Sequence, residues 1–277
     1  PLVIEKIIRK KEFPKIQTPR MRLLLQIPVI EQKVRDTICQ EVKKAFGGNF
    51  FEIIVGGAAF NQEVEQFLHR INFPYTVGYG ATECAPIICY ADWRSFVPGS
   101  CGRAAKNMEV RIDSPDPENV PGEILTRGLN VMLGYYKNEE ATRETIDKDG
   151  WYHTGDLGTM DENGNVFING RSKNMLLSAN GQNIYPEEIE DKLNSMTLVV
   201  ESIVVQRESK LVALVHPDLD EAKALGFTME DLQGIMEQNR NGLNQTLPAY
   251  EKISEIEIYE QEFAKTPKKS IKRYLYT

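Results

Sequence analysis

Two short turns in the first third of the sequence carry residue types that could do chemistry. Residues 56–59 are Gly-Gly-Ala-Ala, residues 79–83 are Tyr-Gly-Ala-Thr-Glu, and each follows an apolar run. Glycines let the backbone approach a ligand closely. Tyr79 offers an aromatic face, Thr82 a hydroxyl and Glu83 a hard carboxylate oxygen of the kind that Mg²⁺ prefers. Taken alone, these residues also fit two tight turns with a surface acid.

The common signatures of phosphate and zinc binding do not occur. The sequence has no G-x-x-x-x-G-K-[ST] segment and no Gly-Lys dipeptide, so read alone it contains no obvious phosphate-binding loop. Its cysteines form no C-x-x-C pair and no histidine stands at metal-ligand spacing, which argues against zinc. Cysteines of this kind are typical of small core residues in a reduced compartment, and we expect a cytoplasmic protein. They are Cys39, Cys84, Cys89 and Cys101.

The composition is that of an ordinary globular protein with an acidic balance. Of the 277 residues, 41% are hydrophobic and 26% are charged, and the net charge is −7. This balance disfavours nucleic acid as a partner. No run approaches about 18 apolar residues, so we expect no transmembrane segment, and no signal peptide is visible. The sequence is compatible with peripheral contact with a membrane and contains no pattern that defines an oligomeric state.

Alternating helices and strands must position the two turns. Apolar residues at every fourth position from Val34 to Phe46 predict a helix, and a Gly-Gly pair ends it. Residues 49–55 then predict a buried strand, Asn61 an N-cap of a second helix, and residues 75–77 a second strand. Such alternation produces parallel strands. Because ligands bind outside the carboxyl ends of parallel strands, we expect the two turns to share one pocket.

The pattern changes near residue 91 and again after residue 171. Alternating apolar residues and an Asp-Glu-Asn-Gly hairpin signal at 161–164 predict antiparallel strands. Further on, Pro186 at the start of a helix and Thr228 as the cap of another predict a compact α+β domain. The predicted fold is therefore α/β plus α+β. It divides into a partial α/β subdomain with parallel strands (1–90), an antiparallel β subdomain (91–172) and a small C-terminal α+β domain (173–277).

Four motifs occur in a fixed order over nearly the whole chain. They are residues 79–83, residues 122–135 (Gly-Glu-Ile to Val-Met-Leu-Gly-Tyr), residues 152–157 (Tyr-His-Thr-Gly-Asp-Leu) and residues 170–173 (Gly-Arg-Ser-Lys). In this order they resemble the adenylate-forming, AMP-binding superfamily, which includes acyl- and aryl-CoA ligases, luciferases and peptide-synthetase adenylation domains. Residues 183–190 and 266–273 look like those of long-chain fatty acid–CoA ligases.

The resemblance implies an enzyme that activates a carboxylic acid, here a long-chain fatty acid, with ATP and transfers it from AMP to coenzyme A. It implies ATP/AMP, Mg²⁺ and coenzyme A as ligands. The residues implied around adenine and the acyl carboxylate are Gly56, Gly57, Ala58, Tyr79, which would stack on adenine, and Gly80. Thr82 would contact the phosphate or carboxylate, and Glu83 would hold Mg²⁺. Asp156 would accept hydrogen bonds from the ribose hydroxyls, and Arg171 would contact the ribose or phosphate. The implied residues of a mobile C-terminal domain are Lys173 at its hinge and Gly181 in the loop that reaches coenzyme A.

One position departs from the family pattern. Family members carry a lysine near the C-terminus that reaches the carboxylate and phosphate oxygens, and the alignment places Ser270 in that position. A serine supplies no cation to the charge that develops in the transition state. We therefore predict that Lys268 or Lys269 takes the catalytic role.

The family's Ser/Thr/Gly-rich phosphate loop also does not occur in the sequence. We therefore expect the chain to be a C-terminal piece of a longer enzyme and to be inactive alone. Two other functions stay open. One is a non-catalytic nucleotide-binding or regulatory protein on this scaffold, which Ser270 favours and the intact Thr82, Glu83, Asp156 and Arg171 disfavour. The other is an adenylation domain that loads a carrier protein.

Overall fold

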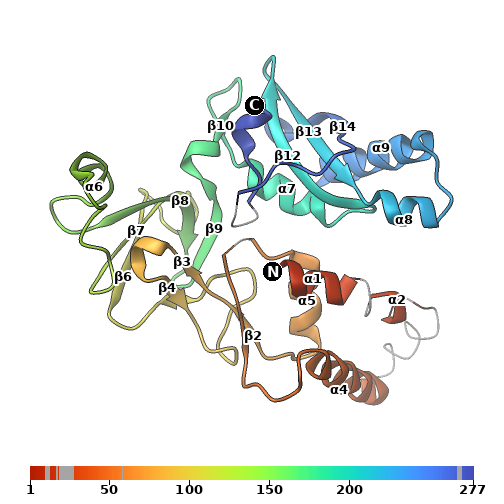
Figure 1. Ribbon diagram of the computed structural model, residues 1–277, viewed down its shortest axis with the longest axis horizontal. Coiled ribbons are helices and arrows are strands. Elements are labelled where there is room, and N and C mark those ends of the chain that lie inside the picture. Colours follow the sequence, from red (N-terminus) through yellow and green to blue (C-terminus); the bar gives the residue numbers. More distant parts are fainter. Residues whose placement is uncertain (10–12, 17, 19–27, 58, 267–269) are drawn as a thin grey trace. The chain divides into compact units, whose positions relative to one another are not determined.

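The chain forms two compact units (Figure 1). The computed structural model describes residues 1–9, 13–16, 18, 28–57, 59–266 and 270–277. The N-terminal unit comprises Pro1–Thr154 and Gly158–Ile168, and the C-terminal unit comprises Gly155–Leu157 and Asn169–Thr277. Each unit has a hydrophobic core of its own.

Helices and a pair of parallel strands form the first part of the N-terminal unit. They are α1 (Leu2–Ile7), α2 (Phe13–Ile16), α4 (Pro28–Ala45), β1 (Ile53–Val55), α5 (Gln62–Arg70) and β2 (Tyr75–Val77). The helix predicted from Val34 onward is α4. Asn61 caps α5 as predicted, because its side chain accepts a hydrogen bond of 3.2 Å from the Val64 N–H. The predicted parallel pairing of the two strands is confirmed.

The first strand is shorter than predicted. Residues 49–55 were expected to be extended, but only Ile53–Val55 pairs, and it pairs with the three residues of β2. Ile53 N–H donates to Pro74 O at 3.0 Å, at the point where β2 begins. Because Pro74 itself has no N–H to donate, it cannot continue the ladder. The partner strand therefore limits the length of β1.

Two further sheets follow β2 in the N-terminal unit, and the second of them includes residues 155–157 and 169–171 of the C-terminal unit. A three-stranded sheet contains β3 (Tyr79–Gly80), β4 (Ile87–Tyr90) and β5 (Arg103–Ala104). A second sheet has the order β6 (Met108–Asp113), β7 (Gly122–Gly128), β8 (Tyr152–Met160) and β9 (Val166–Arg171), and α6 (Glu139–Thr145) lies between β7 and β8 in the chain. The hairpin predicted at 161–164 joins β8 to β9, and Gly164 takes a φ of 80° there.

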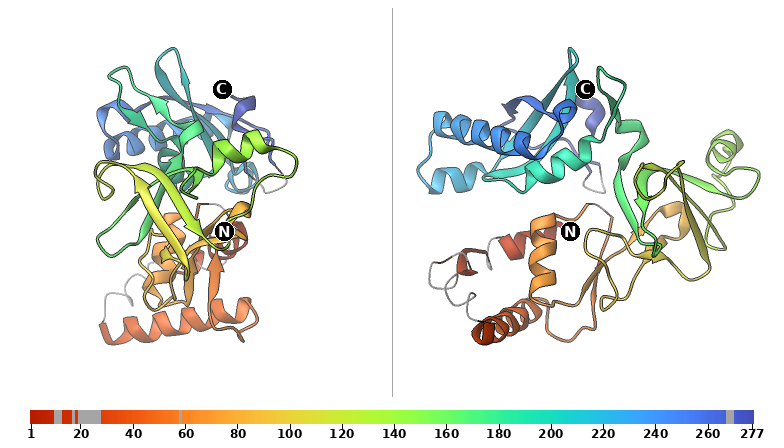
Figure 2. Two further views of the ribbon diagram at one scale, coloured as in Figure 1. Left: turned by 90° about the vertical axis from the view of Figure 1, so that its left-hand side faces the viewer. Right: turned by 180° about the vertical axis from the view of Figure 1, so that it is seen from behind.

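The C-terminal unit is a three-stranded sheet covered on both faces. β13 (Lys210–Pro217) pairs antiparallel with β12 (Val199–Arg207) and parallel with β14 (Ile253–Ile258). The helices α7 (Pro186–Asn194) and α9 (Met229–Thr246) pack on one face (Figure 2). The other face packs against Phe263, Ile271 and Tyr276 of the C-terminal segment. The short elements β10 (Leu176–Leu177), β11 (Asn183–Ile184) and α8 (Leu219–Ala224) complete the unit.

The helix starts predicted for this unit are confirmed. Pro186 occupies the first turn of α7. The Thr228 side chain accepts from the Asp231 N–H at 3.2 Å, and the Asp231 side chain accepts from the Thr228 N–H at 2.8 Å, so that a reciprocal capping box starts α9.

The four cysteines are free and buried, as expected for core residues. Burial raises the pKa of the Cys84 thiol to about 11. Since the thiolate is the nucleophilic form, this thiol is unreactive at neutral pH. In the part of the chain that the structure describes, no helix is long and apolar enough to cross a membrane.

The carboxyl group of Glu65 on α5 is expected to make the N-terminal unit sensitive to pH. Glu65 is 5% exposed, and its carboxylate accepts only the Gly99 N–H among the hydrogen bonds that the structure describes for it, at 3.1 Å. Burial raises its pKa to about 7, against the opposing effect of the Gly99 amide. The folded state then holds a proton that the unfolded state has already released, so stability falls as the pH rises from about 5 to 8.

Glu65→Gln removes this dependence and keeps an acceptor for Gly99. Relative to the native protein, we expect the variant to gain about 2 kcal/mol in free energy of unfolding between pH 5.5 and pH 8. Urea unfolding at the two pH values measures the difference. A constant difference between variant and native protein would mean that Glu65 is ionised in the folded state at both pH values.

Candidate functional site

The carboxyl ends of β1 and β2 lie against each other in the N-terminal unit. The Gly78 N–H donates to Val55 O at 2.8 Å, which extends the contact beyond the strands. A Cβ on Gly56 would lie 3.0 Å from Gly78 O, so the two backbones approach each other closely and a side chain there would be crowded. Gly57 follows with a φ of 83°. The segments directly after the two strands are therefore neighbours, the shared pocket stays a prediction, and Ala58 lies outside the described residues.

The turn after β3 presents the predicted hydroxyl and carboxylate. Thr82 is exposed and Glu83 is half-buried in the 3-10 helix Thr82–Cys84. Gly80 precedes this helix, and a Cβ there would lie 2.0 Å from Pro86 O, so only glycine fits. Tyr79 is 7% exposed and belongs to the hydrophobic core. The stacking of Tyr79 on adenine stays a prediction.

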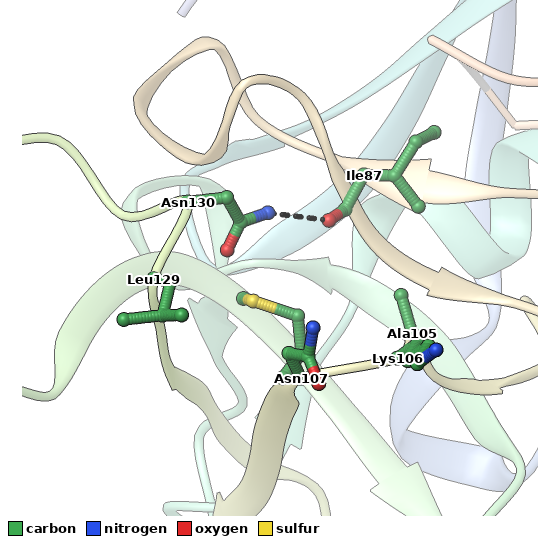
Figure 3. A pocket seen from close by; sticks show the side chains of 7 residues that line it. Ile87, Ala105, Lys106, Asn107, Leu129 and Asn130 are labelled. Carbon is green, nitrogen blue, oxygen red and sulfur yellow. Dashed lines mark hydrogen bonds between the residues drawn. The ribbon is translucent and has the colours of Figure 1, made fainter.

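A cavity of about 260 Å³ adjoins this turn and has Asn130 in its wall (Figure 3). Residues 105–108, Ile87 and Leu129 form the rest of the lining. The Asn130 side-chain amide donates to Cys84 O at 2.6 Å and to Ile87 O at 3.0 Å, and Figure 3 shows the second of these bonds. Asn130 therefore connects the two ends of the segment that follows Glu83.

Two further contacts reach Glu83 itself. Met132 N–H donates to Glu83 O at 2.7 Å, and the Tyr135 hydroxyl donates to Glu83 Oε1 at 2.9 Å. Asn130 and Tyr135 lie in the motif at residues 122–135, but the resemblance assigned no role to either of them. The contact with Glu83 has no local signal, because Tyr135 lies 52 positions from Glu83 in the chain.

Asp156 and Arg171 meet in the C-terminal unit, on the neighbouring strands β8 and β9. Arg171 Nε lies 3.0 Å from Asp156 Oδ1. The Asp156 side chain is only 10% exposed, whereas that of Arg171 is 67% exposed. Gly155 has a φ of 69°, a conformation that favours glycine. The structure thus brings together two residues that the sequence assigned to one ligand, although their contacts with ribose or phosphate stay predictions.

The residues predicted to act in domain movement and coenzyme A binding lie at the surface of the same unit. Lys173 is exposed in the 3-10 helix Ser172–Asn174, directly after β9. Gly181 is exposed in the turn between β10 and β11, with a φ of 75°. The role of Lys173 as a hinge and the role of Gly181 in coenzyme A binding stay predictions.

The predicted catalytic lysines, Lys268 and Lys269, lie outside the described residues. The flanking segments pair with each other: Thr266 N–H donates to Ser270 O, and Lys272 N–H donates to Ala264 O, both at 2.8 Å. Ser270 is therefore part of an antiparallel pairing that includes the bridge between Lys265 and Ile271.

These groups have distinct chemical capacities. The hydroxyl and carboxylate of the 3-10 helix Thr82–Cys84 are hard oxygen ligands that suit a phosphate-bound Mg²⁺. The buried Asp156 carboxylate, when ionised, is an acceptor that suits paired hydroxyl groups.

Comparisons with known proteins give one consistent result. The profile of a family described as AMP-binding enzyme matches residues 3–136. The 4-coumarate–CoA ligase 5 of Oryza sativa subsp. japonica is 39% identical over 166 residues, which are 55% of this chain and 30% of that protein. The long-chain-fatty-acid–CoA ligase ACSBG2 of Gallus gallus is 31% identical over 192 residues, which are 69% of this chain and 25% of that protein.

A solved structure extends the similarity over most of the chain. The crystal structure of ATP-bound MatB from Rhodopseudomonas palustris is 25% identical, with a TM-score of 0.69, and covers 85% of this chain and 46% of that one. This chain spans less than a third of the length of the two curated relatives described above, at 30% and 25%.

Proposed function

We propose that this chain is the C-terminal half of an AMP-forming acyl-CoA ligase of the AMP-binding family of adenylate-forming enzymes, because residues 3–136 match the profile of that family and its relatives include CoA ligases. Its mixed α/β fold with several sheets matches solved adenylate-forming enzymes, so the predicted fold class is confirmed at this level. The division into a partial α/β subdomain, a β subdomain and a mobile C-terminal domain is part of the proposal.

The observation that carries the proposal is the presentation of Thr82 and Glu83. They stand on a turn whose backbone requires Gly80, directly after the paired strand ends. Glu83 would hold Mg²⁺, and Thr82 would donate to the phosphate or the acyl carboxylate. A single protein carboxylate fits this metal, which is usually bound through one or two carboxylates and the substrate phosphates. When bound, Mg²⁺ would neutralise charge on the phosphate oxygens.

The proposed reaction has two steps. A carboxylate oxygen of the acid attacks the α-phosphorus of ATP, the bond to the β-phosphate oxygen breaks, and acyl-AMP and pyrophosphate form. The sulfur of coenzyme A then attacks the acyl carbon and AMP leaves. In this scheme Asp156 accepts the ribose hydroxyls and Arg171 contacts ribose or phosphate, while Gly56, Gly57 and Ala58 line the pocket.

The acid is proposed to be a long-chain fatty acid, on the similarity of residues 183–190 and 266–273. Relatives with other names, such as the 4-coumarate–CoA ligase, make aryl acids the competing class. The cation at the α-phosphate is assigned to Lys268 or Lys269, with Lys173 as the hinge of the C-terminal domain and Gly181 in its coenzyme A loop.

A second candidate is a nucleotide-binding protein without ligase activity. Ser270 favours it, because a serine replaces the cation at that position. Such a protein would bind ATP and form neither acyl-AMP nor pyrophosphate.

We expect the full-length enzyme to convert palmitate, ATP and coenzyme A to palmitoyl-CoA, AMP and pyrophosphate. Turnover of about 1–10³ per second is usual for enzymes. The 277-residue chain alone should form no product, because it lacks a recognisable triphosphate-binding loop. Mass spectrometry of the thioester with palmitate and 4-coumarate in parallel identifies the acid class. ATP binding without pyrophosphate release from either acid would support the second candidate instead.

A further inference from the structure

We infer that Tyr135 and Asn130 are positioning residues that hold Glu83 in the orientation needed for the metal ion. This inference rests on the proposed function, because it takes Glu83 as the Mg²⁺ ligand. Its basis is a set of contacts between the segment from Asn130 to Tyr135 and the 3-10 helix Thr82–Cys84, all within the N-terminal unit.

Tyr135 acts on the carboxylate. Its hydroxyl donates to Glu83 Oε1 at 2.9 Å. A phenolic hydroxyl carries its proton at neutral pH and can donate to a carboxylate. A donor at one carboxylate oxygen fixes the rotation of the group and directs the second oxygen. Outer-shell hydrogen bonds of this kind orient metal ligands in proteins.

The backbone beneath the Tyr135 ring is itself anchored. Tyr135 N–H donates to Thr142 Oγ1 at 2.9 Å, and Thr142 Oγ1 donates to Asn138 O at 2.8 Å. A Cβ on Gly134 would lie 2.8 Å from Thr142 Cγ2, so the chain passes close to α6. The position of the Tyr135 hydroxyl is therefore set by a helix as well as by its own loop.

Asn130 acts on the backbone of the same turn. Its amide nitrogen donates to Cys84 O at 2.6 Å and to Ile87 O at 3.0 Å. These two carbonyl groups lie on either side of Pro86 in the chain. Its Oδ1 is buried and has no hydrogen-bond partner among the described residues. Only the donor half of the amide is used, which is the half that two carbonyl oxygens require. With Met132 N–H on Glu83 O at 2.7 Å, one segment holds both the main chain and the side chain of Glu83.

The test compares Tyr135→Phe with Tyr136→Phe in the full-length enzyme. Tyr136 is the next residue and is 88% exposed, so it is a matched control for the loss of one hydroxyl. The measurement is ATP–pyrophosphate exchange against free Mg²⁺ at saturating ATP. We expect the half-saturating Mg²⁺ concentration to rise about tenfold in Tyr135→Phe, as is typical when an outer-shell partner is lost, and to stay unchanged in Tyr136→Phe.

A double variant separates positioning from a general loss of structure. In the Glu83→Gln background, Tyr135→Phe should cause no further change, because the group that it orients has been removed. Equal Mg²⁺ dependence of the Tyr135→Phe and Tyr136→Phe enzymes would overturn the inference while the enzyme remains a ligase. Absence of exchange in the native full-length enzyme would instead overturn the proposed function, and the inference with it.

Asn130→Ala tests the backbone contacts, with Leu129→Ala as its control. Leu129 is the preceding residue and is 94% exposed. Loss of the two carbonyl contacts should speed hydrogen exchange of the backbone amides in residues 81–88 and of Met132. It should also lower the rate of ATP–pyrophosphate exchange about tenfold or more. Amide exchange as slow as in the Leu129→Ala enzyme would show that Asn130 does not hold the turn.

Discussion

Replacement of Asp156 with alanine in the full-length enzyme is expected to lower kcat/KM for ATP by at least tenfold. In the proposed function this carboxylate accepts hydrogen bonds from both ribose hydroxyls. A hydrogen bond to a charged group contributes about 1.5–3 kcal/mol, and about 1.4 kcal/mol corresponds to tenfold in rate. The loss of two bonds therefore places the expected effect between about 10² and 10⁴, with tenfold as the smallest effect consistent with the role.

The geometry of the pair makes this variant informative. The Asp156 side chain is 10% exposed and that of Arg171 is 67% exposed, so removal of the carboxylate leaves a guanidinium that water can solvate. A large loss of stability is not expected from the broken ion pair, because such half-exposed pairs contribute about 1 kcal/mol or less.

Pyrophosphate exchange at varied ATP measures the effect, and thermal unfolding checks the fold. Arg171→Ala should have the smaller effect on kcat/KM. Unchanged kcat and KM in a folded Asp156→Ala enzyme would show that Asp156 does not bind the nucleotide.

Replacement of Arg273 with alanine is expected to destabilise the C-terminal unit by about 3–5 kcal/mol, the usual cost of removing one partner of a buried ion pair. Arg273 Nη2 lies 2.8 and 2.6 Å from the two Glu190 carboxylate oxygens, and Nη1 donates to Val204 O at 3.1 Å. The side chains are 16% and 10% exposed. Without Arg273, the carboxylate on α7 would stay buried with the Val204 N–H as its remaining partner among the hydrogen bonds described here.

A control variant and a variant expected to restore stability are both available in the C-terminal unit. Arg207 pairs with Glu257 at 2.6 Å, but these side chains are 48% and 39% exposed, so Arg207→Ala should cost about 1 kcal/mol or less. Urea unfolding of the native protein and the two variants measures the contrast. Adding Glu190→Leu to Arg273→Ala should recover part of the stability, because the unpaired charge is removed. Equal losses for Arg207→Ala and Arg273→Ala would show that burial does not strengthen the Glu190 contact.

This ion pair also bears on the predicted catalytic lysines. Arg273 follows Ser270 by three residues, and its ion pair with Glu190 ties the described segment after Ser270 to α7. A kinetic effect of Arg273→Ala on adenylation at a temperature where the fold is intact would be consistent with that connection.

Features that depend on residues close together in the chain could be predicted from the sequence. The Asn61 cap, the start of α7 at Pro186 and the Thr228 cap depend on groups within about four residues, and local hydrogen bonds select the same conformation in any tertiary context. The hairpin at 161–164 belongs to the same class. The parallel pairing of β1 with β2 followed from the helix between them.

The family resemblance extended this to distant motifs but not to the contacts that support them. The motifs assign Asp156 and Arg171 to one ligand, and the structure places the two side chains 3.0 Å apart. Tyr135 and Asn130 also belong to a motif, at residues 122–135, but a supporting residue and an ordinary loop residue look alike in one sequence. Their roles depend on how a segment about 50 residues away packs against the turn, which only the folded chain determines.

Tertiary structure also decided the extent of β1 and the second layer of the C-terminal sheet. Residues 49–52 (Asn-Phe-Phe-Glu) were part of the predicted strand, but a strand is stabilised by its partner, and β2 offers three residues. Ile203, Val205, Val212 and Leu214 form an apolar face of β12 and β13. Phe263 of the C-terminal segment packs against this face and buries it. The sequence by itself therefore determined the elements, their caps and the motif residues. Partner lengths, sheet coverage and the orientation of Glu83 arise from packing between segments whose separation in the chain gives no local signal.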